Sequence, residues 1–203
     1  TRFRFISNKN FDFDMSFGGS FPTETGNNKA RSSMPNLDFT GEIGPRLTYY
    51  LYRDKNIAQV RIGLPLRGTF ATDFKKWYGV GFVLAPIFQA NKYNFLFENL
   101  DLFFSHTLNY LDNGQADYFF EVSTKYETPE RSAYDAHAGF LGSSTSLALK
   151  YQWNNKILLL ATSYSDYTQS VNTVSYLHRS NINWTNFIGF GWIFSKSEKR
   201  GIK

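Results

Sequence analysis

Long stretches of this chain alternate strictly between apolar and polar residues. Residues 11–17 read FDFDMSF, so that every odd position is apolar and every even position is polar. A β-strand places successive side chains on opposite faces, whereas a helix would spread this pattern around its whole surface. Similar runs over 37–51 and 57–71 are long for a soluble protein but suit the ~10 residues of a tilted membrane-spanning strand. The pattern predicts long strands with one apolar and one polar face.

The amino-acid composition fits a sheet whose apolar face is turned outward. Aromatic residues make up 19% of the chain, yet the mean hydropathy is −0.38 because polar residues dilute the rings. A closed sheet in a bilayer has this mixture, with an apolar outside and a polar inside. The most apolar stretch, 77–88, falls short of the ~20 residues that a transmembrane helix needs. We therefore expect an all-β fold, an antiparallel transmembrane β-barrel of a bacterial outer membrane.

The expected strands give a topology. The sequence predicts nine crossing strands, over 1–7, 11–17, 37–51, 57–71, 78–90, 95–105, 144–153, 157–166 and 188–194. A phase change near Glu98 and Asn99 indicates a bulge in the sixth of them, and no helix is predicted. An even-numbered barrel needs at least one strand before Thr1. We expect about 10 strands, or 12 in a longer chain, and a single domain over 1–203 that lacks its N-terminal strand or strands.

The alternation also sorts side chains between lipid and lumen. Those expected to face lipid are Phe11, Phe13, Met15, Phe17, Leu37, Phe39 and Ile43. The charge network expected in the lumen comprises Asp12, Asp14, Asp38, Glu42, Arg46, Arg61 and Arg67. Buried charges must be paired or hydrated, and opposite charges on neighbouring strands can pair. We expect at least one of these arginines to pair with one of the carboxylates and to leave no continuous water path. A selective pore and a lumen site for a small ligand are the alternatives.

Loop lengths predict which segments lie outside the sheet. Barrels in outer membranes have short periplasmic turns and long outer loops. The segment 107–142 is the longest, and its possible strand over 117–122 is too short to span a bilayer. We expect this segment to form a lid over the outer mouth, fixed by Arg131 and Tyr134, with Arg131 hydrogen-bonding to carbonyl oxygens or a carboxylate. A disordered loop is the alternative.

Several kinds of site find little support. The net charge is +5 and the pI is about 9.3, but the basic residues are scattered, so that nucleic-acid binding is not expected. The chain has no cysteine, and His106, His137 and His178 are too dispersed for a metal site. His137, near Asp135, is the one candidate for a hydrolase at the barrel rim, yet nothing in its spacing positions a nucleophile against a base. We expect no catalytic residue and no cofactor.

Basic residues of the expected outer loops suggest one further partner. They are Lys29, Arg31, Arg131 and Arg179. Charge attraction would bring them to phosphorylated headgroups such as those of lipopolysaccharide. Ordinary solvated loop charge explains the same residues equally well.

Four segments, in this order, resemble the MipA/OmpV family of outer-membrane proteins. They are ARSSMPNLD at 30–38, EIGPRL at 42–47, LPLR at 64–67, and ETPERSAYDA at 127–136 followed by Gly139. The resemblance extends from about residue 12 to 194. The chain departs from the family in lacking the region that would precede Thr1 and in continuing past Phe194 to Lys203.

The resemblance implies a function that the residue pattern alone does not. It implies a non-enzymatic outer-membrane barrel that serves as a structural or scaffolding component of the envelope and docks periplasmic enzymes of peptidoglycan remodelling. The short turns expected on the periplasmic side offer such enzymes little surface. A narrow channel for small solutes is the alternative.

Overall fold

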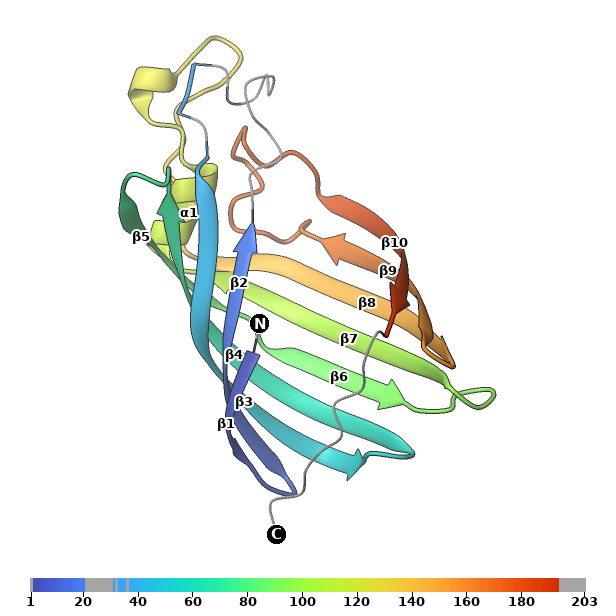
Figure 1. The fold of residues 1–203 in the computed structure, drawn as a ribbon. Helices are drawn as coiled ribbons and strands as arrows, with labels where there is room; N and C mark the ends of the chain where they lie inside the picture. Colours follow the sequence, from blue (N-terminus) through green and yellow to red (C-terminus); the bar gives the residue numbers. More distant parts are fainter. Residues whose placement is uncertain (1, 21–30, 32, 36, 194–203) are drawn as a thin grey trace.

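The computed structural model describes residues 2–20, 31, 33–35 and 37–193. These residues form one antiparallel sheet of ten strands, with a short helix beside it (Figure 1). The sheet confirms the expected all-β, antiparallel fold. Expectations that concern Thr1, Lys29 and the strand end at Phe194 lie outside the described residues.

The strands are long and follow one another with few interruptions. They are β1 (Arg2–Ser7), β2 (Phe11–Ser20), β3 (Phe39–Asp54), β4 (Ala58–Thr72), β5 (Trp77–Leu84), β6 (Ile87–Lys92), β7 (Leu100–Leu111), β8 (Gly139–Trp153), β9 (Lys156–Asp166) and β10 (Ile182–Trp192). Between β7 and β8 lie the helix α1 (Asn113–Phe120) and the single 3-10 turn η2 (Thr124–Tyr126). Among the described residues, neither helix is long and apolar enough to cross a membrane.

Sequence neighbours are also neighbours in the sheet. The order is β1-β2-β3-β4-β5-β7-β8-β9-β10, and β6 pairs with β4 and β7 as β5 does. Because β5 and β6 share one position, the ten strands occupy nine positions, which correspond to the nine segments predicted from the sequence. In the described part of the chain, β1 and β10 are the two edges of the sheet.

The connections alternate between two ends of the curved sheet. The turns after β1, β3, β6 and β8 gather at what we call the turn end, whereas the connections after β4, β7 and β9 gather with α1 at the loop end, where β2 also ends (Figure 1). No turn at the turn end exceeds the seven residues of 93–99, while 112–138 and 167–181 lie at the loop end. The predicted long connections therefore lie at the loop end, together with the four-residue connection 73–76.

The predicted strand over 78–90 is interrupted at Ala85 and Pro86. Proline has no backbone N–H to donate to a ladder, so it is found at strand ends and irregularities. Hydrogen bonding nevertheless continues, because the Ala85 nitrogen donates to the Pro65 carbonyl at 3.1 Å and the Leu108 nitrogen donates to the Pro86 carbonyl at 3.0 Å. The interruption bends this position of the sheet without separating it from its neighbours.

The predicted strand over 95–105 begins five residues later than expected. Residues 93–99 form a turn in which Asn94 and Asn99 have positive φ angles of 50° and 66°. The Asn94 side chain accepts a hydrogen bond from the Asn99 nitrogen at 2.8 Å. Asparagine tolerates the left-handed conformation and favours turns, so the phase change marks a turn rather than the expected bulge.

The two faces of the sheet have opposite character. On β3, Leu47 and Tyr49 are exposed, whereas Thr48 and Tyr50 are buried. Cross-strand partners share a face, so Leu64, which pairs with Leu47, is exposed as well. We call the side of Leu47 and Leu64 the apolar face and the side of Thr48 and Tyr50 the polar face. The exposed side chains are apolar and the covered ones polar, the reverse of a water-soluble sheet.

The helix α1 was not predicted. Its N-cap is Asp112, whose carboxylate accepts a hydrogen bond from the Gln115 nitrogen at 2.9 Å. The helix packs on β5 through two glycines, because a Cβ at Gly114 would lie 2.1 Å from the Val80 carbonyl oxygen and one at Gly81 would lie 2.2 Å from the Asp112 carboxylate. The helix α1 therefore lies beside β5, beyond the residue at which β7 ends. The absence of a side chain at Gly114 and Gly81 allows the helix to come this close to the strand.

Two apolar clusters lie at the loop end. Val83, Ala85 and Leu111 form one buried cluster with Phe120 packed against it. Val122 and Leu177 form a second cluster that includes Met34 and Tyr134. The first cluster joins α1 to β5 and β7, and the second joins the connections after β2, β7 and β9 to one another, so the segment 112–138 packs as a folded cap. Residues 117–122, considered as a possible strand, belong mostly to α1.

Candidate functional site

Asp12 is the centre of a charged cluster on the polar face near the turn end. Its carboxylate has no solvent exposure. It accepts hydrogen bonds from the Ser7 hydroxyl at 2.6 Å and the Tyr50 hydroxyl at 2.8 Å. Arg4 and Arg53 form ion pairs with it at 3.3 and 3.2 Å. This many donors around one carboxylate compensate for its burial.

Two of the expected arginine–carboxylate pairs are present. Arg46 pairs with the buried Asp14 at 3.3 Å, and Arg67 pairs with Glu42 at 2.6 Å. Both pairs join neighbouring strands on the polar face, β2 with β3 and β3 with β4. A further pair, Lys150 with Asp101 at 3.0 Å, joins β8 to β7.

Two residues of the expected charge network and one residue expected to face lipid have other surroundings. Arg61 donates to the side-chain oxygen of Gln89 at 2.9 Å. Asp38 precedes β3 and accepts a hydrogen bond from the Tyr78 hydroxyl at 2.6 Å. Leu37, expected to face lipid, also precedes β3 and lines a cavity at the loop end. The prediction for Leu37 was wrong because the strand begins two residues later than the alternation indicated.

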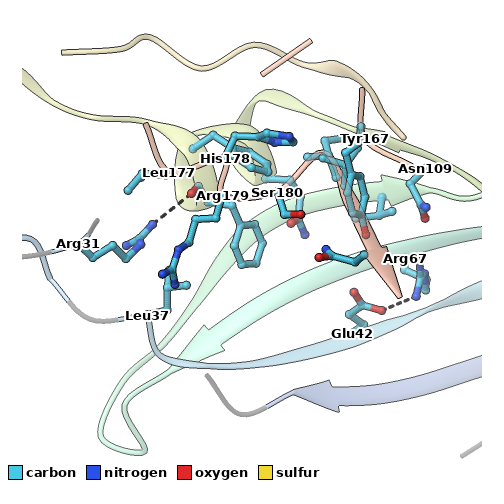
Figure 2. Close-up of a pocket in the computed structure, with 17 residues that line it drawn as sticks. Arg31, Leu37, Glu42, Arg67, Asn109, Tyr167, Leu177, His178, Arg179 and Ser180 are labelled. Carbon is cyan, nitrogen blue, oxygen red and sulfur yellow. Dashed lines mark hydrogen bonds and ion pairs between the residues drawn. The ribbon is translucent and has the colours of Figure 1, made fainter. Parts of the chain in front are cut away.

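The cavity at the loop end has a volume of about 630 Å³. Its lining comes from the sheet, from α1 and from the connections after β2 and β9. The residues are Arg31, Leu37, Glu42, Arg67, Val83, Asn109, Leu111, Gln115, Phe119, Phe120, Leu141, Tyr167, Leu177, His178, Arg179, Ser180 and Asn183. Figure 2 shows Glu42 and Arg67 on one side of this space and Arg31 and Arg179 on another. Three arginines and one glutamate make the lining basic.

Arg31 is held by the C-terminal end of α1. Its guanidinium donates to the carbonyl oxygens of Tyr118 at 3.2 Å and Phe119 at 3.3 Å. The last carbonyl groups of a helix have no partner within the helix and carry partial negative charge, which favours a cation there. These contacts fix the position of the guanidinium at the edge of the cavity.

The segment 112–138 is tied down by the residues expected to fix it and by others. The buried Arg131 donates to the Tyr126 carbonyl oxygen at 3.1 and 2.6 Å. The Tyr134 hydroxyl donates to the side-chain oxygen of Asn172 at 3.1 Å. Burial raises the pKa of Tyr134, and the negative charge of Asp135 raises it further. Arg131 therefore closes the segment on itself, whereas Tyr134 joins it to the connection after β9.

Asn172 is the main link between these two connections. Its side-chain oxygen accepts from the His137 nitrogen at 2.9 Å, and its amide nitrogen donates to the His137 carbonyl at 2.9 Å. Ser175 adds a hydrogen bond to the Phe120 carbonyl oxygen at 2.6 Å. The sequence signal for these residues is weak, because asparagine and serine in a loop usually indicate only turns.

His137, the candidate residue for a rim hydrolase, has no nucleophile hydrogen-bonded to its ring among the described residues. The ring of His137 packs at 6.2 Å from the ring of Tyr134, and among the described residues no hydroxyl group hydrogen-bonds to it. His106 contacts the Thr145 hydroxyl at 2.9 Å, and His178 contacts the Asn181 side chain at 2.9 Å. Within the described ranges, no three His, Cys, Asp or Glu side chains lie close enough together to hold a metal ion.

The cavity was not predicted, although its charged residues were noted separately. Arg67 and Glu42 belong to the expected charge network, and Arg31 and Arg179 to the expected outer loops. Gln115 was missed, since it lies on the helix that the sequence analysis did not predict. An Asp at 112 followed by a run without β-branched residues was the available signal for that helix.

Fold and site together define a class of protein: an antiparallel sheet with an apolar exposed face, a polar covered face held by ion pairs, and a basic cavity under a folded cap. Residues 1–194 match the family described as MltA-interacting protein MipA, and the chain belongs to this family. The resemblance found in the sequence is thereby confirmed. No curated protein and no solved structure matches the chain.

Proposed function

We propose that the protein is a barrel of the bacterial outer membrane that acts as a non-enzymatic scaffold and docks a lytic transglycosylase of the cell wall. Membership of a family named for interaction with MltA carries the scaffold part of the proposal. The barrel part is supported by the two faces of the sheet. The polar face would enclose the lumen, with its charge network inside, and the segment 112–138 would be the outer lid.

The apolar face supports contact with lipid. Large apolar side chains of β3, β4 and β10 are exposed, among them Leu51 at 57% and Ile188 at 77%. Burial of apolar area is worth about 25 cal/mol per Å², so a protein in water would not leave so many of them uncovered. A bilayer would cover them without a partner chain.

Aromatic side chains at both ends of the strands support the same placement. At the turn end Tyr151 stacks on Trp153 at 5.4 Å, and at the loop end Tyr164 packs on Trp184 at 4.9 Å. Trp184 and Trp192 are eight residues apart on β10, which is roughly 26 Å along a strand. At the ~35–45° tilt of strands in such barrels, this spacing corresponds to roughly 20 Å across the bilayer, which is close to the apolar band of about 25 Å between two aromatic girdles.

The turn end offers a specific docking element. In outer-membrane barrels the short turns face the periplasm, where enzymes of the cell wall act. The turn 93–99 carries Leu96, 74% exposed, and Phe97, 54% exposed. Phe97 packs at 5.6 Å from Tyr151, which leaves Leu96 as the outermost apolar side chain of the turn. We place the contact with the transglycosylase at this turn.

Co-purification tests the scaffold proposal. The protein, inserted in lipid nanodiscs, is mixed with a purified lytic transglycosylase of the MltA type and captured through a tag on the nanodisc scaffold. The wild type should retain the enzyme, and Leu96→Ser should weaken retention by about tenfold, the loss of one buried apolar contact. Lys55→Ser, in the neighbouring exposed turn, is the matched control. Failure of the wild type to retain the enzyme would refute the scaffold.

The basic cavity favours one second function, a narrow channel for small solutes. The ion pairs of Asp12 and Asp14 argue against it, because they neutralise charges that would otherwise line a water path on the polar face. Planar-bilayer recordings separate the two functions. We expect no discrete single-channel currents from the wild type, whereas steady ion-selective steps would favour the channel.

A further inference from the structure

The cavity at the loop end contains donors without acceptors. Gln115 is only 2% exposed, and its side-chain nitrogen has no hydrogen-bond partner among the described residues. The Nε atom of Arg67 is likewise buried and without a hydrogen-bond partner there. A buried donor without an acceptor costs about 1–3 kcal/mol. Both residues line the cavity, so a bound acceptor group would remove this cost.

The charges of the cavity select the kind of acceptor. The guanidinium groups of Arg31, Arg67 and Arg179 come from three different elements and line one space (Figure 2). Glu42 is already engaged with Arg67 at 2.6 Å. The carbonyl oxygens that accept hydrogen bonds from Arg31 are neutral groups and fix the position of its guanidinium. A group that satisfies this lining accepts hydrogen bonds and is negatively charged.

The remaining lining is apolar. Phe119 and Phe120 of α1 face the cavity together with Leu37, Leu141 and Leu177. A volume of about 630 Å³ lies within the usual range of small-molecule sites, ~300–1,000 Å³. A simple inorganic ion would leave most of this space and its apolar wall unused.

We propose that the cavity binds a small amphiphilic anion, a phosphate or carboxylate group on an apolar body. The acidic group lies between Arg179, Arg31 and the Gln115 amide, and the apolar body packs against Phe119 and Phe120. This binding site is separate from the scaffold contact at the turn end, and neither depends on the other.

Short alkyl anions that stay monomeric in water test the site. Hexyl phosphate, hexanoate, hexanol and inorganic phosphate are titrated by calorimetry into the full chain in nanodiscs of zwitterionic lipid. The two amphiphilic anions should bind at least about tenfold more tightly than hexanol or inorganic phosphate. Added salt should lower the affinity of both anions. Equal affinity for hexanol and hexyl phosphate would overturn the proposal, as would equal affinity for inorganic and hexyl phosphate.

Substitutions of lining residues test whether the anion binds in the cavity. Arg179→Gln and Gln115→Leu should each lower the affinity for hexyl phosphate by about fivefold to tenfold. Lys75→Gln removes the same charge from an exposed loop at the same end and should change the affinity by less than about twofold. Glu42→Gln should act in the opposite direction and tighten binding, because it removes the carboxylate found among the described lining residues. If Lys75→Gln equals Arg179→Gln, the anion binds by diffuse surface charge and the site does not exist.

A last comparison distinguishes two sources of the same chemical group. Nanodiscs that contain phosphatidic acid offer the acidic group on a lipid. Competition of this lipid with hexyl phosphate in the wild type, but not in Arg179→Gln, supports the site and assigns it to lipid headgroups. Undiminished binding of hexyl phosphate in these discs supports the site and assigns it to soluble anions.

Discussion

The hydroxyl of Tyr50 donates a hydrogen bond of 2.8 Å to the carboxylate of Asp12. Asp12 pairs across the strands with Thr48, so Tyr50 reaches it diagonally from the next position on the same face. The ring of Tyr50 is itself covered by the Arg53 guanidinium, 4.0 Å from the ring centre. One side chain thus joins an anion and a cation on the polar face.

Tyr50→Phe should destabilise the protein by about 1–3 kcal/mol, because it leaves the buried Asp12 carboxylate with one donor fewer. Urea unfolding in lipid vesicles, followed by tryptophan fluorescence, measures the change. Tyr49→Phe, one residue away on the apolar face, is the control and should change stability by less than about 0.5 kcal/mol. Equal effects of the two substitutions would show that the hydrogen bond between Tyr50 and Asp12 does not contribute to the free energy of unfolding.

Leu64→Arg should cost about 2–4 kcal/mol if the apolar face lies in lipid, since a charge near the bilayer midplane is poorly solvated. Val174→Arg, at an 82% exposed position of the connection after β9, should cost less than about 0.5 kcal/mol. Both are measured by the same unfolding assay. A negligible cost at both positions would mean that Leu64 faces water, and the membrane placement would fail.

Asn172→Ala should loosen the segment 112–138. The change removes both hydrogen bonds to the His137 backbone and the nearer of two acceptors of the Tyr134 hydroxyl, the other being the Val171 carbonyl oxygen at 3.4 Å. Amide hydrogen exchange at 134–138 should accelerate about tenfold to hundredfold. Thr173→Ala is the control, because the hydrogen bond of Thr173 to Ser170 comes from its backbone. Unchanged exchange in Asn172→Ala would show that apolar packing alone holds the segment.

Attachment of the segment 112–138 should depend on pH through Tyr134. Burial raises the pKa of its hydroxyl, with a further rise from Asp135. A raised pKa in the folded state means that the stabilisation is complete below the unfolded pKa of about 10 and is lost as pH rises through the folded pKa. Limited proteolysis of the segment should therefore increase above about pH 10. Tyr134→Phe should remove this increase, and Tyr126→Phe should retain it.

The alternation of residues predicted much of the sheet, because it depends only on neighbours along the chain. The opposite faces of Leu47 and Thr48 follow from it directly. It failed where a backbone conformation overrides the pattern, as at Pro86, which interrupts a strand, and at Asn94 and Asn99, which form a turn. The family was recognisable from its segments, and the match over 1–194 confirms it.

The site was less predictable because it depends on contacts between distant segments. The sequence indicated that Arg67 and Glu42 would find opposite charges, but which residues pair depends on the register of β3 with β4. Gln115 reaches the cavity only through α1, whose place beside β5 depends on the close approach of Gly114 and Gly81. No local pattern encodes such an approach.

The uninterrupted order of the strands has an evolutionary consequence. Since β5 and β6 count as one position, each position of the sheet pairs only with the positions before and after it in the chain. Duplication or loss of one hairpin would therefore change the width of the sheet by two strands without rerouting any other connection. Closely related chains of this architecture can differ in width while the cap at one end and the turns at the other keep their places.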